Sequence, residues 1–234
     1  EAAIKRALDE NVWVVNVGTQ ADTSRQAVEL AEKFNHPSLS PSPSEGREGV
    51  GGGVYAVVGL HPVHTYSQHL DEEETFFQSR EEDFNTLEYE SLAQNPKVVG
   101  IGECGLDYYR LPNNDDEDRV KGLQKDAFVA QIKLAQELNK ALVIHCRSSA
   151  GTQDAYEDIL KILDKELGFN LSASDAFGLS PQEGRGPQSA VVPSPFEERV
   201  RERLRFEIHS FTGIPEIAQE FVKRGAYVGL NGII

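Results

Sequence analysis

The 234-residue sequence contains no methionine, one tryptophan and only two cysteines. Cys104 and Cys146 lack the paired spacing of a zinc–thiolate site, and two cysteines are too few for a disulfide framework. We therefore expect small buried thiols, in a protein kept in the reducing interior of the cell, either cytoplasmic or nuclear. Because the sequence lacks methionine, starts in a helical pattern and stops in an apolar run, we also expect it to be an internal piece of a longer protein.

Basic residues are scarce relative to acidic ones: 23 lysines and arginines stand against 38 aspartates and glutamates, a formal net charge of −15. This balance argues against broad adhesion to nucleic acid or to an anionic membrane. It is compatible with a nucleic-acid enzyme whose cleft is locally cationic, because bound divalent ions can be the largest charges in a site. No apolar run reaches membrane length, so no membrane partner is expected, and no obligate protein partner is indicated.

The sequence does contain a regular alternation of short apolar runs and helical patterns. Strands are predicted at Val12–Gly18, Val54–His64, Lys97–Asp107, Ala141–Arg147, Arg205–Phe211 and Ala226–Gly232. Helices are predicted at Asp22–Phe34, Glu72–Gln94, Arg119–Lys140, Asp154–Leu167 and Ile214–Gly225. This alternation predicts an α/β protein with a parallel sheet, either doubly wound or closed as a (β/α)8 barrel. No G-x-G-x-x-G motif follows the first strand, which argues against a dinucleotide-binding open sheet.

Polar side chains recur where the predicted strands end, at His61, Glu103, His145, His209 and Asn231. A barrel brings the carboxyl ends of all its strands to one rim, so this recurrence favours a (β/α)8 TIM barrel. The chain supplies about six of the eight strands, so the barrel is expected to be incomplete within one domain over residues 1–234. Two stretches rich in Pro, Ser and Gly, about 36–53 and 168–197, are predicted to be surface insertions.

Glu103 ends an apolar run that reads as a strand buried on both faces, where an ionised carboxylate is costly unless it is paired or bound to a metal. His145 and His209 end the next two predicted strands. Singly, such a histidine is more often a hydrogen-bonded structural residue. Neighbouring strands lie about 4.8 Å apart, however, so the three side chains could share one ion. One carboxylate and two imidazoles suit Zn, Mn or Fe better than Mg.

Three further residues are candidates for contact with a substrate. His61 and His64 could contact a phosphate or could equally buttress the metal ligands. Arg147 is placed to bind a phosphate bidentately or to form a salt bridge with Asp107. The neighbouring Tyr108 and Tyr109 could stack on an unpaired base, although packing on the barrel top is the simpler interpretation.

The segments GLHPVH, VGIGECGLDYYR, ALVIHCRSS, IHSFTG and GAYVGLNG resemble, in this order, the signature segments of the TatD family of metal-dependent deoxyribonucleases. The resemblance implies a metallo-dependent hydrolase barrel that hydrolyses phosphodiester bonds in DNA, with a 3′–5′ exonuclease activity. It also implies two divalent ions (Mg, Mn or Zn), bridged by Glu103 as the catalytic carboxylate. By the same resemblance, His145 and His209 complete the ligands of the second ion.

The family pattern also has an H-x-H pair after a first strand and an aspartate after the last, and this chain has neither. We therefore expect a longer parent to be an active nuclease and the 234-residue piece to be inactive. Two alternatives stay open: a barrel hydrolase acting on another ester, such as an aminoacyl-tRNA, and an inactive scaffold that only binds.

Overall fold

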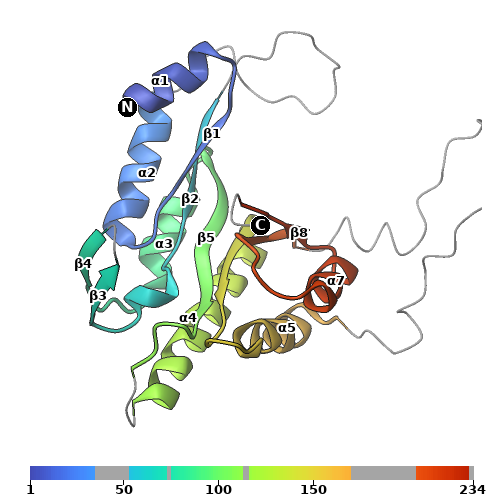
Figure 1. Cartoon of the computed structure of the whole chain (residues 1–234). Coiled ribbons are helices and arrows are strands. Elements are labelled where there is room, and N and C mark those ends of the chain that lie inside the picture. Colours follow the sequence, from blue (N-terminus) through green and yellow to red (C-terminus); the bar gives the residue numbers. More distant parts are fainter. Residues whose placement is uncertain (35–52, 73–74, 113–115, 170–203, 232–234) are drawn as a thin grey trace, which may run out of the picture.

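Six parallel strands form one sheet in the computed structural model, which describes residues 1–34, 53–72, 75–112, 116–169 and 204–231 (Figure 1). The order in the sheet is β1-β2-β5-β6-β7-β8, so the strands run across the sheet in chain order. Their bounds are β1 Val14–Val17, β2 Val54–Val58, β5 Val98–Asp107, β6 Ala141–Arg147, β7 Phe206–His209 and β8 Tyr227–Val228. Among the described residues β1 and β8 are the edges, so the barrel is not closed, as the sequence predicts.

Helices connect the parallel strands and lie on the outer side of the curled sheet (Figure 1). They are α1 Ala2–Asp9, α2 Ala21–Lys33, α3 Thr86–Ala93, α4 Glu117–Glu137, α5 Asp154–Leu167 and α7 Pro215–Lys223, with a short 3-10 helix η1 at Pro62–His64. None of the described helices combines the length and the apolar character needed to span a bilayer. The arrangement is that of a (β/α)8 barrel opened at one side.

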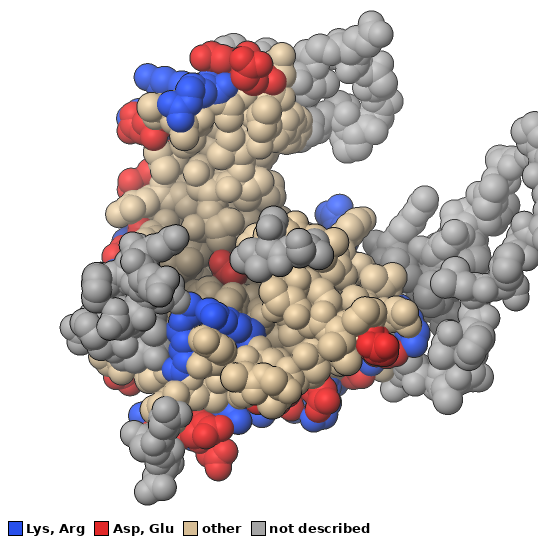
Figure 2. Space-filling view, in the orientation of Figure 1, with Lys and Arg blue, Asp and Glu red and all other residues tan. Residues whose placement is uncertain are grey.

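The two faces of the sheet have different environments. In β6 the side chains alternate: Leu142, Ile144 and Cys146 are buried, whereas their neighbours along the strand are only partly buried. This alternation follows from the two-residue period of a strand. The buried set packs against the helices, and the other set, which includes His145, lies on the opposite, inner side of the sheet. Figure 2 shows that the molecule is hollowed between its two halves.

One helix prediction is wrong in its first half. The range Glu72–Gln94 begins at the end of an antiparallel hairpin, formed by β3 Gln68–Glu72 and β4 Thr75–Ser79, and α3 follows only at Thr86. Thr75, Phe76 and Phe77 are residue types that favour strands, and they outweigh the surrounding acidic residues. The helix begins after Asn85, whose side chain accepts a hydrogen bond from the backbone N–H of Glu88.

Other boundaries also shift. β2 ends at Val58 rather than at His64, because Pro62 starts η1. The helix predicted over Asp22–Phe34 is α2, which begins one residue earlier, at Ala21. The two predicted insertions fall almost wholly on residues 35–52 and 170–203, outside the described parts of the chain.

The buried face of α4 includes polar residues. Val120 and Leu134 are buried, whereas Leu123 and Ala127 are only partly buried. Gln124 and Gln131 are each 1% exposed and occupy the face that packs on the sheet. The sequence pattern gives no reason to place an amide there, and its role is clear only from the partners described below.

Both cysteines are free and buried, as the sequence predicts. Cys104 and Cys146 alternate with Glu103 and His145 along their strands, so they point to the opposite face, toward the helices. Burial raises the pKa of both thiols, which keeps them protonated. They act as small apolar side chains in the core.

Candidate metal centre

Glu103 lies at an irregularity in β5 that sets the direction of its side chain. In the pairing with β6, Gly102 faces Val143 and Cys104 faces Ile144, so Glu103 is the extra residue of a bulge. Bulges commonly re-aim a side chain beside a functional site. Two residues on, Gly105 has a φ of 134°, and a Cβ there would lie 2.1 Å from the His145 carbonyl oxygen, so only glycine allows this close pairing of β5 with β6.

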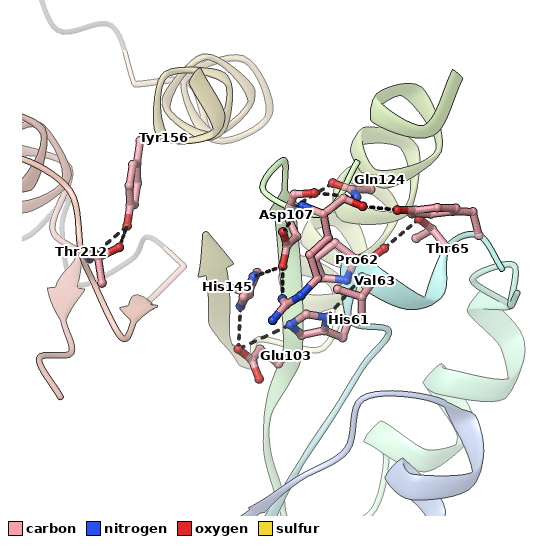
Figure 3. Close-up of polar contacts among 12 residues, drawn as sticks. His61, Pro62, Val63, Thr65, Glu103, Asp107, Gln124, His145, Tyr156 and Thr212 are labelled. Carbon is pink, nitrogen blue, oxygen red and sulfur yellow. Dashed lines mark hydrogen bonds and ion pairs between the residues drawn. The ribbon is translucent and has the colours of Figure 1, made fainter. Parts of the chain in front are cut away.

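His145 on β6 lies between two carboxylates of β5 (Figure 3). Its Nδ1 is 3.1 Å from Glu103 Oε1, and its Nε2 is 3.1 Å from Asp107 Oδ2. Glu103 and Asp107 are four residues apart, an even number, and both side chains meet the same imidazole. The pairing of β5 with β6 therefore makes the central feature of the site.

His61 reaches the same point from the end of β2. Its Nε2 is 3.9 Å from Glu103 Oε1, and its ring centroid is 4.2 Å from that of His145. Its Nδ1 accepts a hydrogen bond from the Val63 N–H at 3.2 Å. In a neutral ring, the proton then sits on Nε2, so His61 presents an N–H to the site rather than a lone pair.

The pKa values of the two imidazoles shift in opposite directions. Burial, and then the nearby His145, lowers the pKa of His61 well below its ordinary value, so this ring is neutral at pH 7. Burial also acts to lower the pKa of His145, but its hydrogen bonds to Asp107 and Glu103 outweigh that effect and raise it. For Glu103, burial acts to raise the pKa, and the hydrogen bond from His145 outweighs it, so the pKa is lowered.

Asp107 is held from several directions. Its Oδ2 accepts from Arg110 Nη1 at 2.7 Å, and its Oδ1 accepts from the Arg110 backbone N–H at 3.3 Å. The Asp107 side chain is fully buried, and Arg110 is 19% exposed. The Asp107 backbone pairs with the side-chain amide of Gln124 on α4 (Figure 3). The Asp107 N–H donates to Gln124 Oε1 at 2.9 Å, and the Asp107 carbonyl accepts from Gln124 Nε2 at 3.0 Å. A carboxylate fixed in this way can orient the His145 ring.

Glu103 and His145 offer a carboxylate oxygen and an imidazole nitrogen that fit a divalent ion, and His61 lies beside them. One ligand atom from each of His61, Glu103 and His145 lies within 4.8 Å of the others. Metal–ligand distances of about 2.0–2.2 Å place two ligands of one ion about 3–3.5 Å apart. The 3.1 Å between His145 Nδ1 and Glu103 Oε1 agrees with that spacing. With Nε2 held by Asp107, His145 also has the carboxylate–histidine partner that a ligating imidazole usually has.

The predicted ligand set and the compact group share Glu103 and His145 but differ in the third member. His209 lies on the neighbouring strand in register with His145. Its side chain is 51% exposed, and its Nδ1 is 3.8 Å from Glu207 Oε1. His61, which the sequence indicates as a substrate contact, takes the third place in the group. The role of His209 as a ligand stays a prediction.

The other predicted substrate residues lie around this group. His64 is buried, and its ring lies edge-on behind that of His61, with centroids 6.3 Å apart. The Arg147 guanidinium lies 3.8 Å above the centre of the Tyr109 ring, which is 54% exposed. Asp107 pairs with Arg110, so the salt bridge weighed for Arg147 belongs to another arginine. Figure 2 shows basic atoms gathered beside the hollow, which has an acidic spot on its floor.

Sequence reasoning missed two contributors to the centre. The orienting role of Asp107 had a signal, because it follows Glu103 by four residues and so shares a face of the same strand. The contact of Gln124 with the Asp107 backbone had none, because an amide in a long helix reads as a surface residue.

Comparisons with known proteins show which family the chain resembles. A family model for TatD related DNase matches residues 1–234. The 3′-5′ ssDNA/RNA exonuclease TatD of Escherichia fergusonii is 27% identical over 215 residues, covering 92% of this chain and 54% of that protein. The metal-dependent hydrolase YabD of Bacillus subtilis is 28% identical over 233 residues, covering 99% of this chain and 62% of that protein.

The fold has a solved counterpart in YJJV, a TatD homologue from Escherichia coli K12. The match to its crystal structure covers 97% of the present chain and 61% of the YJJV chain, with a TM-score of 0.56 and 18% sequence identity. That likeness supports the TIM-barrel type of fold. The chain spans little more than half the length of the relatives described here. With a family model matched along its whole length, this chain belongs to the TatD-related DNase family.

Proposed function

We propose that this chain carries part of the centre of a divalent-metal-dependent deoxyribonuclease that hydrolyses phosphodiester bonds, trimming DNA from the 3′ end. The observation that carries the proposal is the contact of His145 with Glu103 on one side and Asp107 on the other. A histidine that binds a catalytic metal usually donates its other ring N–H to a carboxylate, and here a second carboxylate lies beside the metal-facing nitrogen. Membership of the TatD-related DNase family supports the reaction class.

In this proposal Glu103 and His145 would hold the divalent ions, His145 through Nδ1, while its Nε2–H donates to Asp107. When bound, such ions supply the Lewis acid that activates water and stabilises negative charge on the phosphate. Asp107 and Arg110 fix the direction of the His145 ring. His209, one strand further along, is proposed as a further ligand at the more exposed side.

The DNA contacts follow from the direction of the neighbouring groups. His61 is neutral with Nε2–H facing the site, so it is suited to donate a hydrogen bond to a phosphate oxygen. The sequence allowed two roles for His64, contact with a phosphate or support of the metal ligands. Because His64 is buried beside the His61 ring, we assign it the second role. Arg147 offers a guanidinium for the next phosphate, and the exposed ring of Tyr109 beneath it offers a surface for base stacking.

Metal binding is the first test. Titration calorimetry of the chain with Mn²⁺ should show binding, and Glu103→Gln should raise the dissociation constant at least about a hundredfold, because a ligating charge is lost. Glu137→Gln is the matched control, since Glu137 is exposed on α4 and far along the helix from the site-facing residues. Equal Mn²⁺ affinity in Glu103→Gln and the unsubstituted chain would refute the assignment of Glu103.

Hydrolysis is the second test. A single-stranded DNA labelled at its 5′ end should be shortened stepwise with Mn²⁺ or Mg²⁺, and a blocked 3′ end should prevent it. The assay should compare the 234-residue chain with a longer form that also carries the H-x-H pair and the aspartate of the family pattern. Only the longer form is expected to cleave. Hydrolysis of an aminoacyl-tRNA ester without cleavage of DNA would favour the alternative substrate.

A further inference from the structure

Two buried glutamines on α4 hold the backbone of two residues at the ends of neighbouring strands. Gln124 accepts from the Asp107 N–H at 2.9 Å and donates to the Asp107 carbonyl at 3.0 Å. Gln131 accepts from the Leu60 N–H at 2.9 Å and donates to the Leu60 carbonyl at 3.0 Å. Each side-chain amide thus pairs with both backbone groups of one residue, as an adjacent strand would.

The helix geometry makes the two pairs a matched set. Gln124 and Gln131 are seven residues apart, so they lie on one face of α4, about 10 Å apart along its axis. Both are 1% exposed, and a buried amide is destabilising unless its polar atoms are hydrogen-bonded. The fit around Gln131 is close: a Cβ on Gly59 would lie 2.6 Å from Gln131 Oε1. Neither amide has freedom to take another position.

The two residues that are held adjoin the metal centre. Asp107 contacts His145 Nε2 at 3.1 Å, so any rotation of the Asp107 backbone moves the partner that orients this imidazole. Leu60 immediately precedes His61, whose ring faces Glu103 at 3.9 Å. One helix therefore holds the backbone beside the partners of two imidazoles, His145 and His61, and both imidazoles lie next to Glu103.

We propose that Gln124 and Gln131 are positioning residues of this centre: Gln124 sets the His145 ring through Asp107, and Gln131 sets the direction of His61. The proposal rests on the proposed function for the identity of the site. It does not depend on a bound ion for its test, because both imidazoles have their protein contacts in the chain itself.

The test uses Gln124→Met and Gln131→Met, which keep side-chain length and remove the amide, with Gln136→Met as the control because Gln136 is exposed on the same helix. Metal-free NMR would measure amide exchange at Asp107 and Leu60 and the imidazole ¹⁵N shifts of His145 and His61. Gln124→Met should speed exchange at Asp107 and shift the His145 nitrogens. Gln131→Met should speed exchange at Leu60 and shift the His61 nitrogens.

A purely structural role gives a different result. Both variants would then lose thermal stability and exchange faster, while the imidazole ¹⁵N shifts of His145 and His61 stayed as in the unsubstituted chain, and the proposal would be overturned. If Gln124→Met does not fold, Gln124→Glu retains an acceptor for the Asp107 N–H and is measured in its place. Unchanged His145 shifts in that variant, together with faster exchange at Asp107, would overturn the role of Gln124.

Metal titration separates this proposal from the proposed function. Gln124→Met should raise the Mn²⁺ dissociation constant about ten- to hundredfold, the usual effect of disturbing a partner that orients a ligand. Gln136→Met should leave it unchanged. If the unsubstituted chain does not bind Mn²⁺, the proposed function fails for this chain, and the imidazole shifts still decide whether the glutamines position the two rings.

Discussion

The β5–β6 pair and the β7–β8 pair hold their polar residues very differently. β5 and β6 pair over seven positions, whereas β7 and β8 pair over two. Leu142 and Ile144 on β6 are fully buried, but Tyr227 on β8 is 68% exposed. Glu103 and His145 are each 18% exposed, and His209 is 51% exposed.

This difference shows what converts a polar residue at a strand end into part of a site. His145 has paired strands on both sides and a carboxylate at each nitrogen, so its ring has one orientation. His209 occupies an equivalent position in the register, but the neighbouring strand is short and its side chain reaches solvent. Two histidines at equivalent strand ends therefore differ in how firmly their side chains are held.

The largest effect is expected from Asp107→Ala. This change breaks the ion pair of Asp107 with Arg110 and removes the group that orients His145. Breaking a buried ion pair by removing one partner typically lowers the free energy of unfolding by about 3–5 kcal/mol. Urea unfolding would measure it. Asp116→Ala is the control, since Asp116 and Arg119 have the same three-residue spacing at the surface and should contribute at most about 1 kcal/mol.

A smaller effect separates the two histidines. His145→Ala should raise the Mn²⁺ dissociation constant at least about a hundredfold, because it removes a ligand that is already oriented. His209→Ala should raise it about tenfold, because the ring must first be ordered from solvent. Calorimetry on both variants is the measurement. An effect of His209→Ala equal to that of His145→Ala would show that the β7–β8 side is as well organised as the β5–β6 side.

The smallest effect is expected at the edge strand. Tyr227→Thr should change the free energy of unfolding by less than about 0.5 kcal/mol, because the ring is mostly exposed and threonine also favours strands. Ile144→Val, on the buried face of β6, should cost about 1 kcal/mol by comparison. Denaturant midpoints for the two variants would test this contrast, and a larger loss at Tyr227 would mean that β8 is more firmly packed than its exposure indicates.

Local patterns were sufficient for much of the fold. Parallel strands buried on both faces read as continuous apolar runs, so Val98–Asp107 and Ala141–Arg147 could be placed from the sequence. The hairpin at β3 and β4 could not, because acidic residues there favoured a helical interpretation and only pairing between the two segments stabilises a strand.

The sequence by itself determined the parallel α/β alternation, the open barrel and the convergence of Glu103 with His145, because strand periodicity is local and parallel strand ends share one rim. Tertiary structure alone decided that His61 joins this pair while His209 stays at the edge. It also decided that Asp107, Gln124 and Gln131 orient the group. The reason is physical: an orienting contact depends on bulges, register and burial between distant segments, which no local pattern contains.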